Sequence, residues 1–158
     1  MPQGTLDQVR SITLFQGLSD ADLTAVAALS TVRELQPREE LVEESAHGDD
    51  VYGLVGGRVS IHLAMPDGRD SDAIAQLRSG DCVGESILLG RTRRIATATA
   101  RDRVVALRWE GKTLLAHFDA HPATGYVVMR NLARIVLERL TATNMMLRNT
   151  LNQIVGIL

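Results

Sequence analysis

The chain has 158 residues, of which 45% are apolar and 23% are charged, and this size and composition fit one globular domain. Its 17 Lys and Arg residues against 19 Asp and Glu residues give a formal charge of −2, so its overall charge favours neither a polyanion nor a membrane surface as a partner. The single cysteine, Cys82, excludes an intrachain disulfide and any zinc or iron–sulfur site built from cysteines alone.

The N-terminal segment has neither the basic region nor the apolar region of a signal peptide. No apolar run approaches the ~18 residues that a membrane span needs. We therefore expect a cytoplasmic protein that does not enter a membrane.

The first part of the chain predicts helix over residues 6–29, with a break at residues 15–18. Ser19, followed three residues later by Asp22, resembles a capping box and predicts that a second helix begins at Asp20. These residues form a helical head ahead of a differently patterned middle segment.

The middle of the chain, residues 31–108, consists of short apolar runs separated by turn residues. Two such runs, Val51–Val55 and Val59–Leu63, flank a Gly-Gly pair, and Pro66–Gly68 predicts a hairpin turn. Repeated short strands with glycine turns predict a β-barrel or a sandwich.

The strand pattern stops after Trp109. Residues 110–118 predict a short helix, and Pro122 begins a long helix that no further proline interrupts up to Leu158. One face of this helix is apolar at three- and four-residue spacing: Ala133, Val136, Leu140, Thr143, Leu147, Leu151, Ile154 and Leu158.

This apolar stripe must be covered, either by the chain's own barrel or by a second copy. A helix of about thirty residues is roughly 45 Å long, which exceeds a small barrel. We therefore expect the distal part of the helix to form a homodimer.

The stretch from Gly80 to Thr97 carries the most chemical information. A glycine turn and an acid, Gly84 and Glu85, precede a short helical turn, and Arg94 follows the acid by nine residues at the start of a strand. Free N–H groups at a helix start attract an anion, an arginine adds charged donors, and a carboxylate accepts from a ribose hydroxyl. This arrangement suits a phosphorylated sugar.

The same stretch resembles the phosphate-binding cassette of cyclic nucleotide-binding domains, a family that includes the catabolite activator protein and kinase regulatory subunits. Further matches lie at Leu14–Ser19, at Gly48 and Gly57, which fall at turns of the family's β-roll, and at Leu77–Glu85. The resemblance implies an α+β fold, in which a β-roll, a jelly-roll-like antiparallel barrel, is flanked by N-terminal helices and a long C-terminal helix. It implies one domain over residues 1–158, with helices over 1–30, the roll over 31–108 with its cassette at 84–97, and helices over 109–158.

The resemblance also implies roles for individual residues. Glu85 would accept the ribose 2′-hydroxyl, and Arg94 would bind the cyclic phosphate. Gly84 would allow close approach of the backbone, and the phosphate would be lined by the N–H groups of Ser86, Ile87 and Ile95. Ile61 and Ile74 are candidates for the apolar wall, and Arg139, with its neighbour Leu140, lies where a lid residue of the last helix would cover the base.

The sequence departs from the family pattern at three cassette positions. Ser86 and Ile87 replace the usual leucine and small residue, and Val83 replaces a frequent phenylalanine. We interpret these changes as tuning of affinity. Ile95 stands where cGMP-preferring relatives tend to carry threonine, which favours cAMP as the ligand, with cGMP as the other possibility.

Other functions have weaker support. The arginines between 91 and 108 form a basic cluster of the kind that can bind nucleic acid. They cannot all share one surface, because strands alternate their faces, so we do not expect nucleic-acid binding. His117 and His121 have the four-residue spacing of a metal pair but lack a clear third ligand, so we expect no metal. No nucleophile occurs with its base, so we expect no catalytic site.

We therefore expect a cyclic nucleotide sensor that acts on an unidentified downstream protein. Because the sequence ends at Leu158, we expect no DNA-binding module. The alternative is a scaffold for protein–protein interaction that has lost its ligand and in which Glu85 and Arg94 form an ordinary ion pair.

Overall fold

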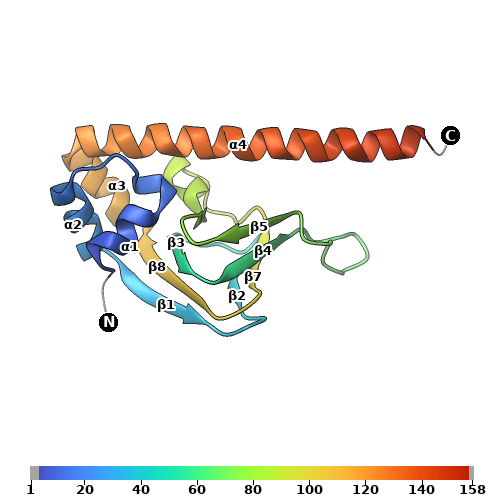
Figure 1. The fold of residues 1–158 in the computed structure, drawn as a ribbon, viewed down its shortest axis with the longest axis horizontal. Helices are drawn as coiled ribbons and strands as arrows, with labels where there is room; N and C mark the ends of the chain where they lie inside the picture. The colour runs from blue at the N-terminus through green and yellow to red at the C-terminus, as the bar shows by residue number, and fades with distance from the viewer. Residues whose placement is uncertain (1–3, 157–158) are drawn as a thin grey trace.

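The computed structural model describes residues 4–156 (Figure 1). Its elements in chain order are α1 (Leu6–Ser11), η1 (Thr13–Phe15), α2 (Asp20–Ala28), β1 (Thr31–Leu35), β2 (Glu40–Val42), β3 (Asp50–Gly56), β4 (Arg58–His62), β5 (Ala75–Arg78), β6 (Cys82–Val83), η2 (Glu85–Leu89), β7 (Thr97–Ala100), β8 (Val104–Glu110), α3 (Gly111–Ala120) and α4 (Pro122–Val155). The predicted order of helical head, strand-rich middle and helical tail is confirmed, and the last strand extends two residues beyond the predicted boundary at Arg108.

The strands form two four-stranded antiparallel sheets, in the orders β1-β8-β3-β6 and β2-β7-β4-β5. Alternate residues of each strand point between the sheets, where Leu54, Val59 and Ala98 belong to one apolar core. The predicted hairpin turn joins β4 to β5, where Gly68 adopts a φ of 80° and donates its N–H to Met65 O at 2.9 Å. The predicted α+β fold with its β-roll is therefore confirmed.

A second core lies between the sheet containing β8 and the helices at one end of the roll. Trp109 of β8 is fully buried, packs against Phe15 with the two rings tilted and 5.0 Å between their centroids, and donates its indole N–H to Val26 O at 2.8 Å. The side chain of Ser19 accepts a hydrogen bond from the N–H of Asp22 and so starts α2, as the sequence predicts. These contacts fix the helical head on the roll.

Helix α4 divides into an anchored half and an exposed half. Its first part packs on the helical head, and Ile135 is its last buried residue. Asn131 is buried, and its side-chain amide donates to Leu14 O at 3.1 Å and to Gln16 O at 2.7 Å. Beyond this anchor the helix continues past the roll as a single rod (Figure 1).

The apolar stripe predicted on this helix is exposed. Leu140, Leu147 and Leu151 each leave half or more of their surface open to solvent. The distal stripe therefore does not pack on the chain's own roll. Leu158, the last predicted member of the stripe, lies outside the described residues.

Among residues 4–156, no helix combines the length and the apolar content that crossing a membrane requires.

We predict that Asn131→Ala destabilises the protein by about 2 kcal/mol, because the buried carbonyl of Leu14 and the partly buried carbonyl of Gln16 lose their donor. Urea unfolding measures the change. Asn144→Ala, an exposed asparagine of the same helix, is the control and is expected to cause no loss. Equal stability of the two variants would contradict the role of Asn131 as the anchor of α4.

Candidate functional site

The predicted cassette forms the connection between β6 and β7 and contains η2. Cys82 and Val83 of β6 pair with β3 and are buried. Gly84 and Gly90, which bound η2, have φ values of 81° and 84°, in the left-handed region that glycine adopts without strain. The sequence of this segment therefore specifies the two sharp turns that present η2 at the end of the roll.

Arg94 is buried inside the roll, with 7% of its surface exposed. Its Nη2 donates to Asp50 O at 2.9 Å. A Cβ atom at Gly84 would collide with Arg94 Nη1, and one at Gly48 would lie 2.5 Å from its Nε and Nη2. The guanidinium therefore lies in a cradle formed by two glycines that come from different loops.

The backbone of Arg94 is fixed by the loop before β3. Arg94 N–H donates to Ala46 O at 3.0 Å, and Ser45 N–H donates to Arg94 O at 2.9 Å. Gly48 N–H donates to Thr92 O at 3.0 Å. These three bonds hold the cassette against residues that are about fifty positions earlier in the chain and orient the arginine inward.

The charge of Arg94 is only partly compensated. Burial lowers the pKa of its guanidinium, while Tyr52, Asp50, Asp49 and Glu85 act in the opposite direction. Within residues 4–156, Arg94 forms no ion pair and its Nη1 has no hydrogen-bond partner. The group remains a cation at neutral pH, so an anion in this part of the roll would be stabilised.

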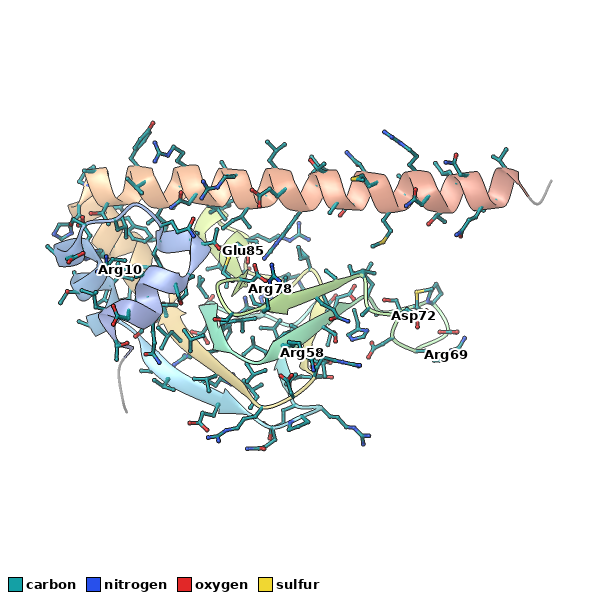
Figure 2. The ribbon with its side chains drawn as sticks, in the orientation of Figure 1. Arg10, Arg58, Arg69, Asp72, Arg78 and Glu85 are labelled. Carbon is teal, nitrogen blue, oxygen red and sulfur yellow. The ribbon has the colours of Figure 1, made fainter. Side chains whose placement is uncertain are left out.

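Glu85, the first residue of η2, is also buried, with 5% of its surface exposed. Its Oε1 forms an ion pair with Arg139 Nη1 of α4, and Arg139 Nη2 donates to Cys82 O at 2.7 Å. Figure 2 shows Glu85 directly beneath α4. Among the described residues Glu85 Oε2 has no hydrogen-bond partner.

The charges of Glu85 and Arg94 are thus not paired with each other in the part of the chain that the structure describes. The prediction that Glu85 and Arg94 pair with each other, made for a scaffold without a ligand, is therefore wrong. Each side chain has a different partner, because Asp50 O binds Arg94 and Arg139 binds Glu85.

Backbone donors complete the cassette. In the described segment, the N–H groups of Ser86 and Ile95 donate to no other protein group. The N–H of Ile87 donates to Gly84 O at 3.2 Å, and its side chain is buried against Gly111. The bulky side chain of Ile87 therefore packs toward the start of α3, and that of Ile95 is largely exposed.

The two remaining predicted residues, Ile61 and Ile74, lie together where β4 meets the turn leading into β5. Ile74 N–H donates to Ile61 O at 2.8 Å, and both residues are half-buried. Ile61 packs against the core between the sheets.

A cleft of about 590 Å³ lies between α4 and β5. It is lined on the helix side by Ile135, Glu138 and Arg139, and on the roll side by residues that include Leu77 and Cys82. Neither Glu85 nor Arg94 lines it. The guanidinium of Arg139 therefore lies between this cleft and the buried carboxylate of Glu85.

Sequence reasoning missed three features of this site. It placed Gly48 at a turn of the roll but not against Arg94, it gave no role to Cys82 O, and it did not pair Arg139 with Glu85. The match of the cassette at residues 84–97 carries no information on these contacts, because each joins segments that are distant in the chain.

The two histidines that the sequence singled out, His117 and His121, lie side by side at the end of α3. Their rings stack at 4.3 Å between centroids, and no group of three His, Cys, Asp or Glu side chains between residues 4 and 156 could hold a metal ion. Burial lowers the pKa of His117, and the neighbouring His121 lowers it further.

The comparison with known families matches residues 32–121 to the cyclic nucleotide-binding domain. The chain therefore belongs to the cyclic nucleotide-binding domain family, as the cassette predicts.

Three relatives illustrate the similarity. Glutaminase 1 of Bradyrhizobium diazoefficiens is 30% identical over 83% of this chain and 20% of its own length. The CRP-like cAMP-activated global transcriptional regulator of Mycobacterium tuberculosis is 28% identical over 83% of this chain and 56% of its own. The solved N-terminal domain of a transcriptional regulator from Streptomyces coelicolor has a TM-score of 0.72 at 27% identity and covers 87% of this chain and 95% of that one. The chain thus spans about a fifth of the glutaminase and about half of the mycobacterial regulator.

We predict that Gly84→Ala destabilises the protein more than Gly90→Ala. Both positions have a left-handed φ, which costs a non-glycine residue roughly 1–2 kcal/mol. Only the Cβ at position 84 would also collide with Arg94 and Asp50 O, because nothing lies within 4 Å of a Cβ at Gly90. The difference between the two variants in free energy of unfolding, measured with urea, reports the collision alone. Equal losses of stability would contradict the close packing of Arg94 against Gly84.

Proposed function

We propose that this chain is a regulatory module that binds a cyclic nucleotide, with cAMP favoured over cGMP. One observation carries the proposal: two buried side chains of opposite charge, Arg94 and Glu85, each keep one atom without a partner among the described residues. A buried polar atom without a partner is costly, so a ligand that satisfies both atoms gains binding energy.

A cyclic nucleotide has the groups that these atoms need. Its phosphate oxygens accept from Arg94 Nη1 and from the free N–H groups of Ser86 and Ile95. Its ribose 2′-hydroxyl donates to Glu85 Oε2. Gly84, without a side chain, allows the ribose phosphate to approach the backbone. The backbone of Ile87 helps to form the turn that faces the phosphate, and its side chain packs against Gly111 at the start of α3.

The base lies toward the apolar wall of Ile61 and Ile74, and Arg139 of α4 is the lid residue on the opposite side. Ile95 has no hydroxyl to bind the amino group of guanine, which supports cAMP. The mycobacterial relative is a cAMP-activated regulator, which supports the same ligand.

The output of the module is the position of α4, read by a second copy and by an unidentified downstream protein in the cytoplasm. The exposed stripe of α4 supports a homodimer, because a long apolar face is otherwise an aggregation risk. The module itself is not catalytic.

Calorimetric titration of cAMP into the wild type, Arg94→Ala and Arg91→Ala tests the binding proposal. Arg94→Ala removes one partner of a desolvated charge pair, which costs about 2–5 kcal/mol, so affinity falls more than tenfold. Arg91 is exposed and lies three positions before Arg94 in the chain. Arg91→Ala therefore serves as the control that also removes one positive charge, and it is expected to leave the affinity unchanged.

Equal affinities of Arg94→Ala and wild type would contradict the assignment of the phosphate site. Absence of binding of both cAMP and cGMP to the wild type would favour the ligand-free scaffold.

The dimer is tested by light scattering on Leu147→Asp. The exposed apolar side chain of Leu147 lies in the stripe, so a charge there is expected to convert the dimer to a monomer. Asn149→Asp adds the same charge on another face of α4 and leaves the dimer intact. A wild type that stays monomeric as its concentration rises would remove this part of the proposal.

A further inference from the structure

A second cleft, of about 420 Å³, lies on the outer face of the sheet that contains β2, β7, β4 and β5. Thr99 of β7 alternates with the core residues Ala98 and Ala100, so its side chain points away from the core. Two of the described residues that line the cleft are arginines, none carries a carboxylate, and none belongs to the cassette. The lining residues come from the turn between β1 and β2, the end of β4 and the end of β7: Pro37, Arg38, His62, Thr99, Ala100 and Arg101.

The two arginines of this cleft have no partner for their charge inside the described chain. Between residues 4 and 156, neither Arg38 nor Arg101 forms an ion pair. The carboxylates next to them in sequence bind elsewhere: Glu39 accepts a backbone N–H of its own turn at 2.7 Å, and Asp102 accepts from Arg58 Nε at 2.8 Å. The positive charge on this face is therefore available to an anion from outside the chain.

The backbone at Arg38 shows that its side chain is kept at a conformational cost. Glu39 N–H donates to Gln36 O at 3.1 Å and closes a four-residue turn, in which Pro37 is second and Arg38 third. Arg38 has a φ of 74°, a value that glycine normally supplies at the third position of a turn. Its N–H donates to Ala100 O at 2.8 Å, which fixes the turn against the end of β7. Arginine therefore adds nothing to the turn itself, and what it contributes is a side chain that lines the cleft.

Neutral polar groups lie beside the two cations. His62 Nδ1 is 2.9 Å from Ser71 O and carries a proton, because a carbonyl only accepts. Thr99 adds its hydroxyl to the lining. Ser60 pairs in register with Thr99 and so shares its face of the sheet, and the buried hydroxyl of Ser60 has no hydrogen-bond partner among the described residues. This face of the sheet therefore supplies hydroxyl groups as well as charge.

We propose that this cleft binds a small organic phosphomonoester, at a site separate from the one proposed for the cyclic nucleotide. A phosphomonoester carries a charge of about −1.5 to −2 at neutral pH, which two guanidinium groups match. The phosphodiester of a cyclic nucleotide has a smaller charge and leaves one arginine uncompensated. Arginine binds phosphate oxygens through paired hydrogen bonds, and the hydroxyl of Thr99 is a further donor. The volume of the cleft lies within the range of small-molecule sites, roughly 300–1,000 Å³, so it also has room for the organic part.

One carboxylate on the same face limits the affinity of this site. Glu40 pairs in register with Thr99 but does not line the cleft, and it forms no ion pair in the part of the chain that the structure describes. Its charge opposes an incoming anion. Glu40→Gln is therefore expected to bind a phosphomonoester more tightly than the wild type.

Titration of glycerol 2-phosphate into the full chain, followed by NMR at the arginine Nε–H groups, tests the site. The signals of Arg38 and Arg101 are expected to shift together and to saturate. Arg38→Gly and Arg101→Ala are each expected to weaken binding at least fivefold, because each removes a charged donor. Arg148→Ala removes the same charge from an exposed position of α4 and is expected to stay within twofold of the wild type.

Arg38→Gly separates a binding role from a structural one. Glycine accepts the φ of this position, so the urea midpoint of the variant is expected to equal or exceed that of the wild type while binding is lost. The variant is also expected to bind cAMP as the wild type does. Unshifted signals of Arg38 and Arg101, or unchanged affinity in Arg38→Gly, would overturn the proposal. So would binding of glycerol 2-phosphate that is lost in Arg94→Ala and kept in Arg38→Gly, because the phosphate would then lie in the cassette.

Discussion

The burial of one guanidinium organises the site. A charge moved out of water is stable only where other groups replace its hydration. Arg94 has one carbonyl oxygen, Asp50 O, and two glycines whose missing side chains leave room for it. The loop before β3 and the turn before η2 must therefore both keep their conformations for Arg94 to remain inside the roll. The burial of Arg94 therefore depends both on the local φ of Gly84 and on the packing of segments that are about fifty residues apart in the chain.

Helix α4 is the second constraint, because it is a rigid rod held at one end. Between Gly125 and Gly156 it contains neither glycine nor proline, the residues at which helices usually kink. Asn131 and the buried residues up to Ile135 fix its first half on the helical head. The distal segment therefore continues in the direction that the anchored half sets, with no residue at which a kink is expected.

Much of the fold could be predicted from the sequence, because local patterns decide it. The strand spacing of the middle segment, the turn at Gly68 and the start of α4 at Pro122 all depend on residues close together in the chain. The membership in the family followed from Gly84, Glu85 and Arg94 in the same way. The cradle of Gly48 and the pairing of Arg139 with Glu85 could not be predicted, since each depends on how distant segments pack. Nor could the sequence show that the side chain of Ile87 packs against Gly111 at the start of α3, because that contact joins segments that are distant in the chain.

The separate partners of Glu85 and Arg94 connect the two constraints. Had the two side chains neutralised each other, the cassette would be electrostatically complete, and neither a ligand nor the helix would have an unpaired group to bind. Because Glu85 is instead bound from α4, the carboxylate is shared between the interior of the roll and the distal helix. Linkage between two binding events is reciprocal. Whatever factor a partner of α4 imposes on the affinity for a ligand at Glu85, the ligand must therefore impose the same factor on the affinity for that partner.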